Sequence, residues 1–302
     1  MQISTSSFYD TAGTLMQQLS QQADTINTQI ATTKKFSAPS DDVVAYQRLT
    51  TLKQASADAT SYAGNITLAQ SLLQQSDTTL GSVTSQLQSA SELAVSANNG
   101  TLNASDRQAM ATELQGILNS VVALANTKDA RGQPLFGAAT GAGAVTQAAD
   151  GSVTFDGTGN PASIPVADGV SVQPTESAAR VFGGIPTASG GTTDVFATLQ
   201  GLITALNNND TAAISAASSG VTAASNQVAA VRGSIGVRET SLDLQQSQAT
   251  DAATARETDR SALEDTDVTT AITQLQKTMT VLQATQASFT KLSSLSLFDY
   301  LK

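Results

Sequence analysis

Apolar residues recur at alternating spacings of three and four towards both ends of this 302-residue chain. An average period of 3.5 residues is typical of a helix that buries a narrow seam against another helix. The middle of the chain is rich in Gly, Thr and Ser, and short strand-like runs replace the helical period there. The pattern predicts a rod built from helices of opposite chain ends, with a β-rich insert.

Two seam runs lie in each half of the chain. In the N-terminal half they are Phe8, Ala12, Leu15, Leu19, Ala23, Ile26 and Ile30, and then Ile66, Ala69, Leu73, Ser76, Leu80, Val83, Leu87, Ala90 and Ala94. In the C-terminal half they are Val221, Ala224, Val228, Val231, Ile235, Arg238 and Leu242, and then Val268, Ile272, Leu275, Met279, Leu282, Gln286 and Phe289. The predicted fold class is therefore mainly α: a long antiparallel coiled-coil rod made from both chain ends, with a small β-rich inserted domain.

Capping and turn residues set the expected helix boundaries. We expect a helix over residues 5–33, a polar loop over 34–42 in which Ser37 or Ser40 caps the next helix, and a long helix that ends at Asn98-Asn99-Gly100. Ser105 and Gln108 fit a capping box for the helix that follows. After the insert, we expect a short helix from Asp194 and one almost continuous helix over residues 211–292.

The insert is expected to contain short strands joined by turns at Asp150-Gly151, Asp156-Gly157 and Asp168-Gly169. These boundaries divide the chain into three parts. They are a terminal helical assembly region of residues 1–40 and 268–302, a discontinuous helical rod of residues 41–136 and 194–267, and a β-rich outer insert of residues 137–193.

Charge is sparse in the outermost helices. The only charged residues of the first helix are Asp10 and Asp24, and the only ones between Val268 and Ser296 are Lys277 and Lys291. Polar amphipathic helices of this kind bury too little surface to stay folded alone. Because they carry so little charge, they can nevertheless pack against copies of themselves without repulsion. We therefore predict an assembly interface formed by Phe8, Leu15, Leu19, Ile26, Ile30, Ile272, Leu275, Met279, Leu282, Phe289, Leu297 and Phe298.

Composition argues against an enzyme. With no Cys and no His, the chain lacks a thiol nucleophile, the commonest general base and the commonest zinc ligands. The acidic pairs Asp41/Asp42 and Asp265/Asp267 are better explained by helix-start electrostatics and by a solvated helix face, respectively. We expect no catalytic residues, no metal and no cofactor.

The net charge of −10 makes nucleic acid and anionic membranes unfavourable partners. The sequence contains no run of 18 apolar residues and therefore predicts no membrane-spanning helix. The start Met1-Gln2-Ile3-Ser4-Thr5 lacks the basic and apolar regions of a cleaved signal peptide, so we expect a chain that is cytosolic or exported without one.

Several short motifs, in this order, resemble the hook-filament junction proteins of bacterial flagella (hook-associated protein 3), which are relatives of flagellin. They are Met1–Thr5, Pro39-Ser40-Asp41-Asp42, Asn65, Glu92–Val95 with Asn98–Leu102, Asp106-Arg107-Gln108, Leu124–Thr127 and Ser296–Leu301. The resemblance covers about residues 1–137 and 195–302, and leaves the insert unmatched.

The resemblance implies a structural subunit that leaves the cell through the flagellar type III export apparatus and assembles as a ring between hook and filament. It implies contacts with other copies of the chain, with the hook-side hook-associated protein and with flagellin, and an export chaperone on the C-terminal helix. Its expected location is the extracellular flagellum. The alternatives are a flagellin of the filament itself and a surface adhesin that uses the β-rich insert.

Overall fold

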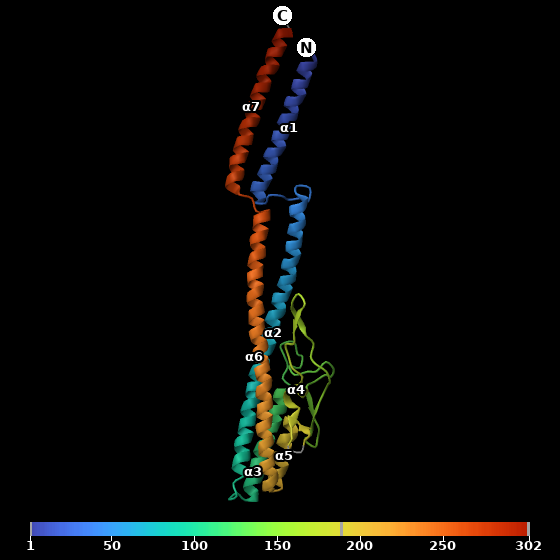
Figure 1. Cartoon of the computed structure of the whole chain (residues 1–302), viewed down its shortest axis with the longest axis vertical. Helices are drawn as coiled ribbons and strands as arrows, with labels where there is room; N and C mark the ends of the chain where they lie inside the picture. The colour runs from blue at the N-terminus through green and yellow to red at the C-terminus, as the bar shows by residue number, and fades with distance from the viewer. Residues whose placement is uncertain (1, 188–189, 301–302) are drawn as a thin grey trace. The chain divides into compact units, whose positions relative to one another are not determined.

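The computed structural model describes residues 2–187 and 190–300, with side chains for residues 7–187 and 190–291. The chain is mostly helical, with long helices towards both ends and short strands in the middle (Figure 1). It forms two compact units: one combines the chain up to Asp58 with the chain from Asp251, and the other is Ala59–Thr250. The helices are α1 (Gln2–Thr32), α2 (Val43–Ala97), α3 (Ala104–Ala125), α4 (Ala178–Phe182), α5 (Val195–Asn207), α6 (Thr211–Glu264) and α7 (Val268–Tyr300).

The predicted seam of the central unit is confirmed. All nine seam positions from Ile66 to Ala94 on α2 are buried, as are the α6 positions from Val221 to Leu242 apart from Arg238. The two seams belong to one hydrophobic core, which α3 and α5 complete. Short turns join α2 to α3 and α5 to α6, so each of these pairs runs antiparallel (Figure 1).

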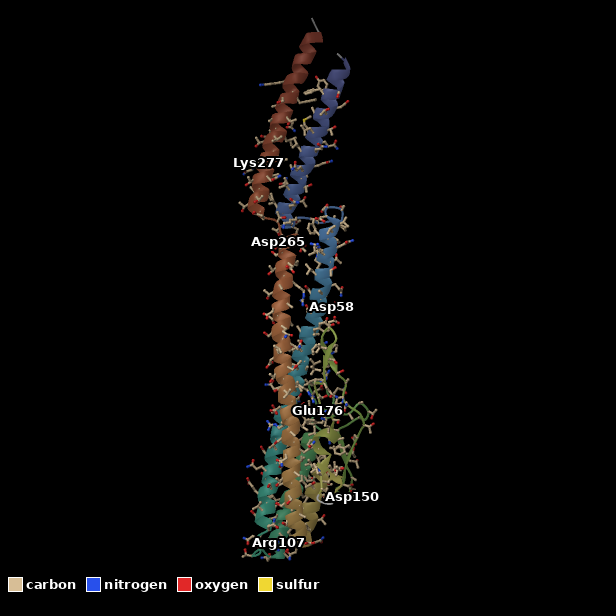
Figure 2. The ribbon with its side chains drawn as sticks, in the orientation of Figure 1. Asp58, Arg107, Asp150, Glu176, Asp265 and Lys277 are labelled. Carbon is tan, nitrogen blue, oxygen red and sulfur yellow. The ribbon has the colours of Figure 1, made fainter. Side chains whose placement is uncertain are left out.

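A buried arginine closes the end of this unit where the two turns meet (Figure 2). Arg107 is only 4% exposed. Its guanidinium donates to the carbonyls of Ala97 and Asn99, at 3.2 and 3.1 Å, and to the side-chain oxygen of Asn209. Carbonyls at the end of a helix lack partners within the helix, so Arg107 satisfies the last turn of α2 and ties it to the α5–α6 turn.

The cap of α3 differs from the prediction. Asn103, not Ser105, is the N-cap: its side chain accepts the backbone N–H of Asp106, and the Asp106 carboxylate accepts the backbone N–H of Asn103. Asn is as good a cap as Ser, and Asp can take the reciprocal position, so the same reciprocal capping forms two residues earlier.

The insert consists of three antiparallel two-stranded hairpins. They pair β1 (Val145–Gln147) with β2 (Val153–Phe155), β3 (Ile164–Ala167) with β4 (Val170–Val172), and β5 (Ile185–Pro186) with β6 (Thr192–Thr193). Gly151 and Gly169 have φ values of 86° and 68°, which confirms the turns predicted there. Gly157 is not a hairpin turn. A side chain there would place Cβ 1.8 Å from the carbonyl oxygen of Thr140, so Gly157 permits a close backbone contact instead.

Two asparagines named among the motifs attach the insert to the helices. Asn126 pairs with the backbone of Val145, donating to its carbonyl at 2.9 Å and accepting its N–H at 3.2 Å. Asn65 on α2 donates to the carbonyl of Pro165 at 2.8 Å. Because an amide side chain matches the donor and acceptor of a peptide group, each anchors a hairpin that has no other strand beside it.

A buried carboxylate attaches the insert to α6 (Figure 2). Glu176 is 1% exposed and pairs with Arg238 of α6, and at 3.4 Å with Arg180. Arg238 also donates to the carbonyl of Gln173 at 3.0 Å. A buried charge is tolerated only when it is paired and hydrogen-bonded, and Glu176 meets that condition.

In the unit formed by the chain ends, two backbone hydrogen bonds join the segment after α1 to the segment before α7. Lys35 donates its N–H to the carbonyl of Glu264 at 2.7 Å, and Thr266 donates to the carbonyl of Thr33 at 2.9 Å. The Glu264 carboxylate, 2% exposed, contacts Lys34 at 2.6 Å and Arg260 at 2.8 Å. We call this set of contacts the joint.

The joint explains why residues 211–292 are not one continuous helix, as predicted. The α6 helix ends at Glu264 and α7 begins at Val268. Asp267 caps α7, because its carboxylate accepts the N–H groups of Thr269 and Thr270 at 3.0 and 3.2 Å. The signal was present in the sequence as an Asp just before an apolar helical run, but it was assigned to a solvated face.

The other acidic pair also serves a helix start. Asp42, not Ser37 or Ser40, caps α2 by accepting the N–H of Ala45 at 2.9 Å. Asp41 accepts the backbone N–H groups of Ser37 and Ala38, and these hydrogen bonds lower the pKa of its carboxyl group. The helix-start explanation of this pair is confirmed.

Replacing Glu176 tests its role in holding the insert. Glu176→Gln should lower the free energy of unfolding by about 3 kcal/mol, because it leaves the largely buried Arg238 without its carboxylate partner. The control is Arg180→Gln, which removes the half-exposed partner and should cost less than about 1 kcal/mol. Urea denaturation followed by circular dichroism measures both. Equal effects of the two changes would contradict the assignment.

The joint predicts a dependence on acid. Hydrogen bonding from Lys34, against the opposing effect of burial and supported by Arg260, lowers the pKa of Glu264 below its ordinary value of 4.5. A carboxyl group with a lowered pKa in the folded state stabilises that state above its unfolded pKa, and this contribution is lost as the pH falls through the folded pKa. Protection of the Lys35 and Thr266 amides from hydrogen exchange should therefore decrease below about pH 4.5.

Glu264→Gln should decrease the protection of these amides already at pH 7 and remove its further loss in acid. The matched control is Glu257→Gln, which removes the solvent-exposed partner of Arg260 and should leave both amides protected. Acid-independent protection in the unmodified chain would contradict the account of the joint.

Candidate assembly interface

Helices α1 and α7 form an antiparallel pair within one compact unit (Figure 1). In the first half of α1 and the second half of α7, the rings of Tyr9 and Phe289 pack edge to face with centroids 5.4 Å apart. The inward-facing positions, buried or half-buried, keep spacings of three and four. They are Tyr9, Ala12, Met16, Leu19, Ala23, Ile26 and Ile30 on α1, and Ala271, Leu275, Thr278, Leu282, Thr285 and Phe289 on α7.

Most predicted seam positions of this pair are confirmed as inward-facing, but Phe8, Leu15, Ile272 and Met279 are not. These four side chains are 45%, 44%, 42% and 41% exposed. Gln286 is exposed as well. At each of these positions, a residue directly next to it in the sequence faces the partner helix instead.

The physical reason is that a small or flexible neighbour fits the narrow space better. Ala271 and Thr278 are 8% and 6% exposed, and they let the two helices approach where Ile272 and Met279 are too large. On α1 the flexible Met16 replaces Leu15, whereas Tyr9 replaces Phe8 without being smaller, and its ring packs against Phe289. Both registers obey the spacing of three and four, so the sequence period alone did not separate them.

The displaced residues gather on two sides of the pair. On one side, Phe8 and Leu15 of α1 and Val281 of α7 line a groove of about 440 Å³. The groove also includes Thr11, Ala12, Ala284, Thr285, Ser288 and Phe289. We call this surface the groove face.

The other side carries Ile272 and Met279, which we call the ridge face. The α1 residues that directly follow inward positions are Asp10, Gly13, Gln17, Ser20, Asp24, Asn27 and Ala31. A side chain added at Gly13 would meet no atom within 4 Å. The ridge face therefore combines the exposed apolar side chains of Ile272 and Met279 with a row of small, polar and acidic α1 residues.

Charged side chains are few around the α1–α7 pair. Among residues 7–32 and 268–291, the charged side chains are Asp10, Asp24, Lys277 and Lys291, and all four are exposed. None lies at an inward position or lines the groove, whereas Asp10 and Asp24 directly follow inward residues and therefore lie on the ridge side. The groove face therefore offers apolar contact area without a charge to desolvate, and the ridge side carries two exposed carboxylates.

Within residues 2–187 and 190–300 no group of His, Cys, Asp and Glu side chains is arranged to hold a metal ion. In the same residues, every helix is too short or too polar to cross a membrane. The predicted interface residues Leu297 and Phe298 have side chains outside the described residues.

Sequence reasoning missed Tyr9, Met16 and Val281. The first two were detectable, because Tyr9, Ala12 and Met16 keep the same spacing as the residues chosen. Val281 had no comparable signal, since it lies outside every inward position and its place in the groove depends on how α1 packs.

Comparison with known proteins places these helices in a family. Residues 3–140 match the bacterial flagellin N-terminal helical region. Flagellar hook-associated protein 3 of Salmonella typhimurium strain LT2 is 30% identical over 289 residues, which is 90% of this chain and 90% of that protein. The protein of the same name from Escherichia coli strain K12 is 30% identical over 294 residues, 91% of each chain.

Solved structures agree in fold. A putative flagellar hook-associated protein from Vibrio parahaemolyticus has a TM-score of 0.67 and 24% identity, and the match covers 74% of this chain and 100% of that one. Hook-associated protein 3 from Legionella pneumophila has a TM-score of 0.65 at 16% identity, covering 70% and 98%. Together with the 30% identity along nine-tenths of the chain, these matches lead to one conclusion: the chain belongs to the flagellar hook-associated protein 3 family.

Proposed function

We propose that this chain is a structural subunit of the junction between hook and filament, and that its α1–α7 pair packs against the pairs of neighbouring copies. The observation that carries the proposal is the exposure of Phe8, Leu15, Ile272 and Met279 on faces of that pair that carry little charge. Exposed apolar residues rimmed by polar ones mark interaction sites.

The physical gain from such packing is burial. Each half-exposed apolar side chain that becomes covered contributes roughly 1 kcal/mol, at about 25 cal/mol per Å². A single contact of this kind is weak, but the contributions of many identical contacts add up in a closed assembly. This suits a subunit that has to be exported as a single chain and then assemble.

The partners follow from the family and from the apolar chemistry of the faces. We infer contacts with other copies in a ring, with the hook-side hook-associated protein on one side and with flagellin on the other. An export chaperone would cover α7 before assembly, because the same apolar residues would otherwise be exposed to solvent. The location would be the extracellular flagellum, reached without a cleaved signal peptide. The role is structural and non-enzymatic.

A double substitution within the α1–α7 seam tests whether assembly depends on this pair. Leu282→Asp with Phe289→Asp should separate α1 from α7, since each carboxylate would face a packed apolar helix at a cost of several kcal/mol. Cells that carry this variant should keep hooks and release flagellin into the medium. The central unit should keep the unfolding transition of the unmodified chain in circular dichroism.

The matched control is Thr280→Asp with Ala287→Asp, which adds the same two charges, also seven residues apart, at exposed positions of α7 that lie on neither the groove face nor the ridge face. This control should retain filaments. Filament retention by the Leu282→Asp, Phe289→Asp variant would contradict the proposal, as would equal flagellin release by both variants.

A further inference from the structure

We infer that the contact between neighbouring copies is asymmetric: the ridge face of one α1–α7 pair docks into the groove face of the next. The inference rests on the proposed function and specifies which surfaces of the pair meet. A self-complementary contact would instead join two copies by the same face, and would stop at a dimer.

The two faces lie on opposite sides of one pair. Phe8, Leu15 and Val281 each come directly before an inward residue, whereas Ile272 and Met279 each come directly after one. Successive residues of an α-helix are about 100° apart, so the positions before and after an inward residue point to opposite sides of the seam. In an antiparallel pair, the preceding positions of both helices meet on one side, as the lining of the groove shows.

The faces also complement each other in shape. The groove face is hollow between α1 and α7, and the groove has a volume of about 440 Å³. On the ridge face the projecting apolar side chains are Ile272 and Met279, 42% and 41% exposed, beside the α1 row of Ser20, Asp24 and Asn27. Apolar burial is efficient only when surfaces fit, and a hollow face fits a projecting face better than it fits a copy of itself.

The surrounding charges favour the same arrangement. On the groove side, Lys277 (labelled in Figure 2) is one helical turn from Val281, and Lys291 is one turn from Ser288. On the ridge side, Asp10 is one turn from Gly13 and Asp24 is one turn from Asn27. The groove side is thus positive and the ridge side negative, so unlike faces attract and like faces repel.

The positions along the helix set the offset between copies. The groove is centred near residue 285 of α7, and the ridge lies between residues 272 and 279. The difference of roughly ten residues corresponds to a displacement of about 15 Å along the helix axis. Each copy would therefore be shifted along the axis relative to the previous one. This offset places Ile272 of one copy beside Leu15 of the next.

Engineered cysteines test this pairing without background, since the chain has no cysteine. Flagella would be isolated from cells that express the full chain with Leu15→Cys and Ile272→Cys, and oxidised. Within one copy the two positions lie on opposite sides of the pair and at different heights, too far apart for a disulfide. We expect a ladder of dimers, trimers and longer species for the double variant and single chains for either change alone.

Three results bear on the inference. Dimers from Leu15→Cys alone would overturn it, because they require groove faces to meet each other. Single chains from the double variant in flagella that keep their filaments would also overturn it, while leaving the proposed function intact. A Gln17→Cys, Ile272→Cys pair is the control for non-specific oxidation, because Gln17 is exposed away from the groove, and it should give no ladder.

A charge exchange keeps the test decisive if the cysteine variants fail to assemble. Leu15→Lys and Ile272→Glu, each alone, should reduce filament retention by about tenfold or more, since each places an unpaired charge in the contact. The combined variant should recover most of that loss if the two residues meet across copies. No recovery relative to the single changes would overturn the inference.

Discussion

The fold depends on narrow seams between helices that lie far apart in the sequence. A seam of one residue in every three or four buries little area per turn, so no single helix gains enough to be stable alone. Stability comes from length and from pairing across the chain: α2 with α6, and α1 with α7. The joint connects the segment after α1 to the segment before α7, and so sets the position along the two helices at which the α1–α7 pair begins.

The narrowness of the seams explains the low aromatic content of 4% and the frequent Ala, Ser and Thr. At inward positions of the outer pair, Ala271 and Thr278 allow close approach and leave the larger Ile272 and Met279 outside. The chain thus retains apolar side chains that its own fold does not cover. We propose that these are the surfaces that bind a neighbouring copy.

The sequence predicted the helical architecture, the central seam and the location of the insert. The period was sufficient for the central seam, because the series from Ile66 to Ala94 is continuous and only scattered apolar residues such as Leu68, Leu72 and Leu93 lie outside it. It was insufficient for α1 and α7, where two adjacent registers carry apolar or small residues and only packing decides between them. The break at Asp267 and the cap at Asn103 were missed for another reason: several Asp, Asn and Ser residues near each boundary can cap a helix equally well. Arg107, Asn126 and Asn65 were recognised as motif residues, but their roles as backbone partners depend on contacts between distant segments.

The central claim is that the α1–α7 pairs of neighbouring copies contact each other through opposite faces. An electron cryomicroscopy map of the hook-filament junction tests it most directly. The account predicts that every pair in the junction has neighbours on both sides, with Phe8 and Leu15 of one copy covered by Ile272 and Met279 of the next. A map in which these four side chains face solvent, or in which like faces meet, would contradict it.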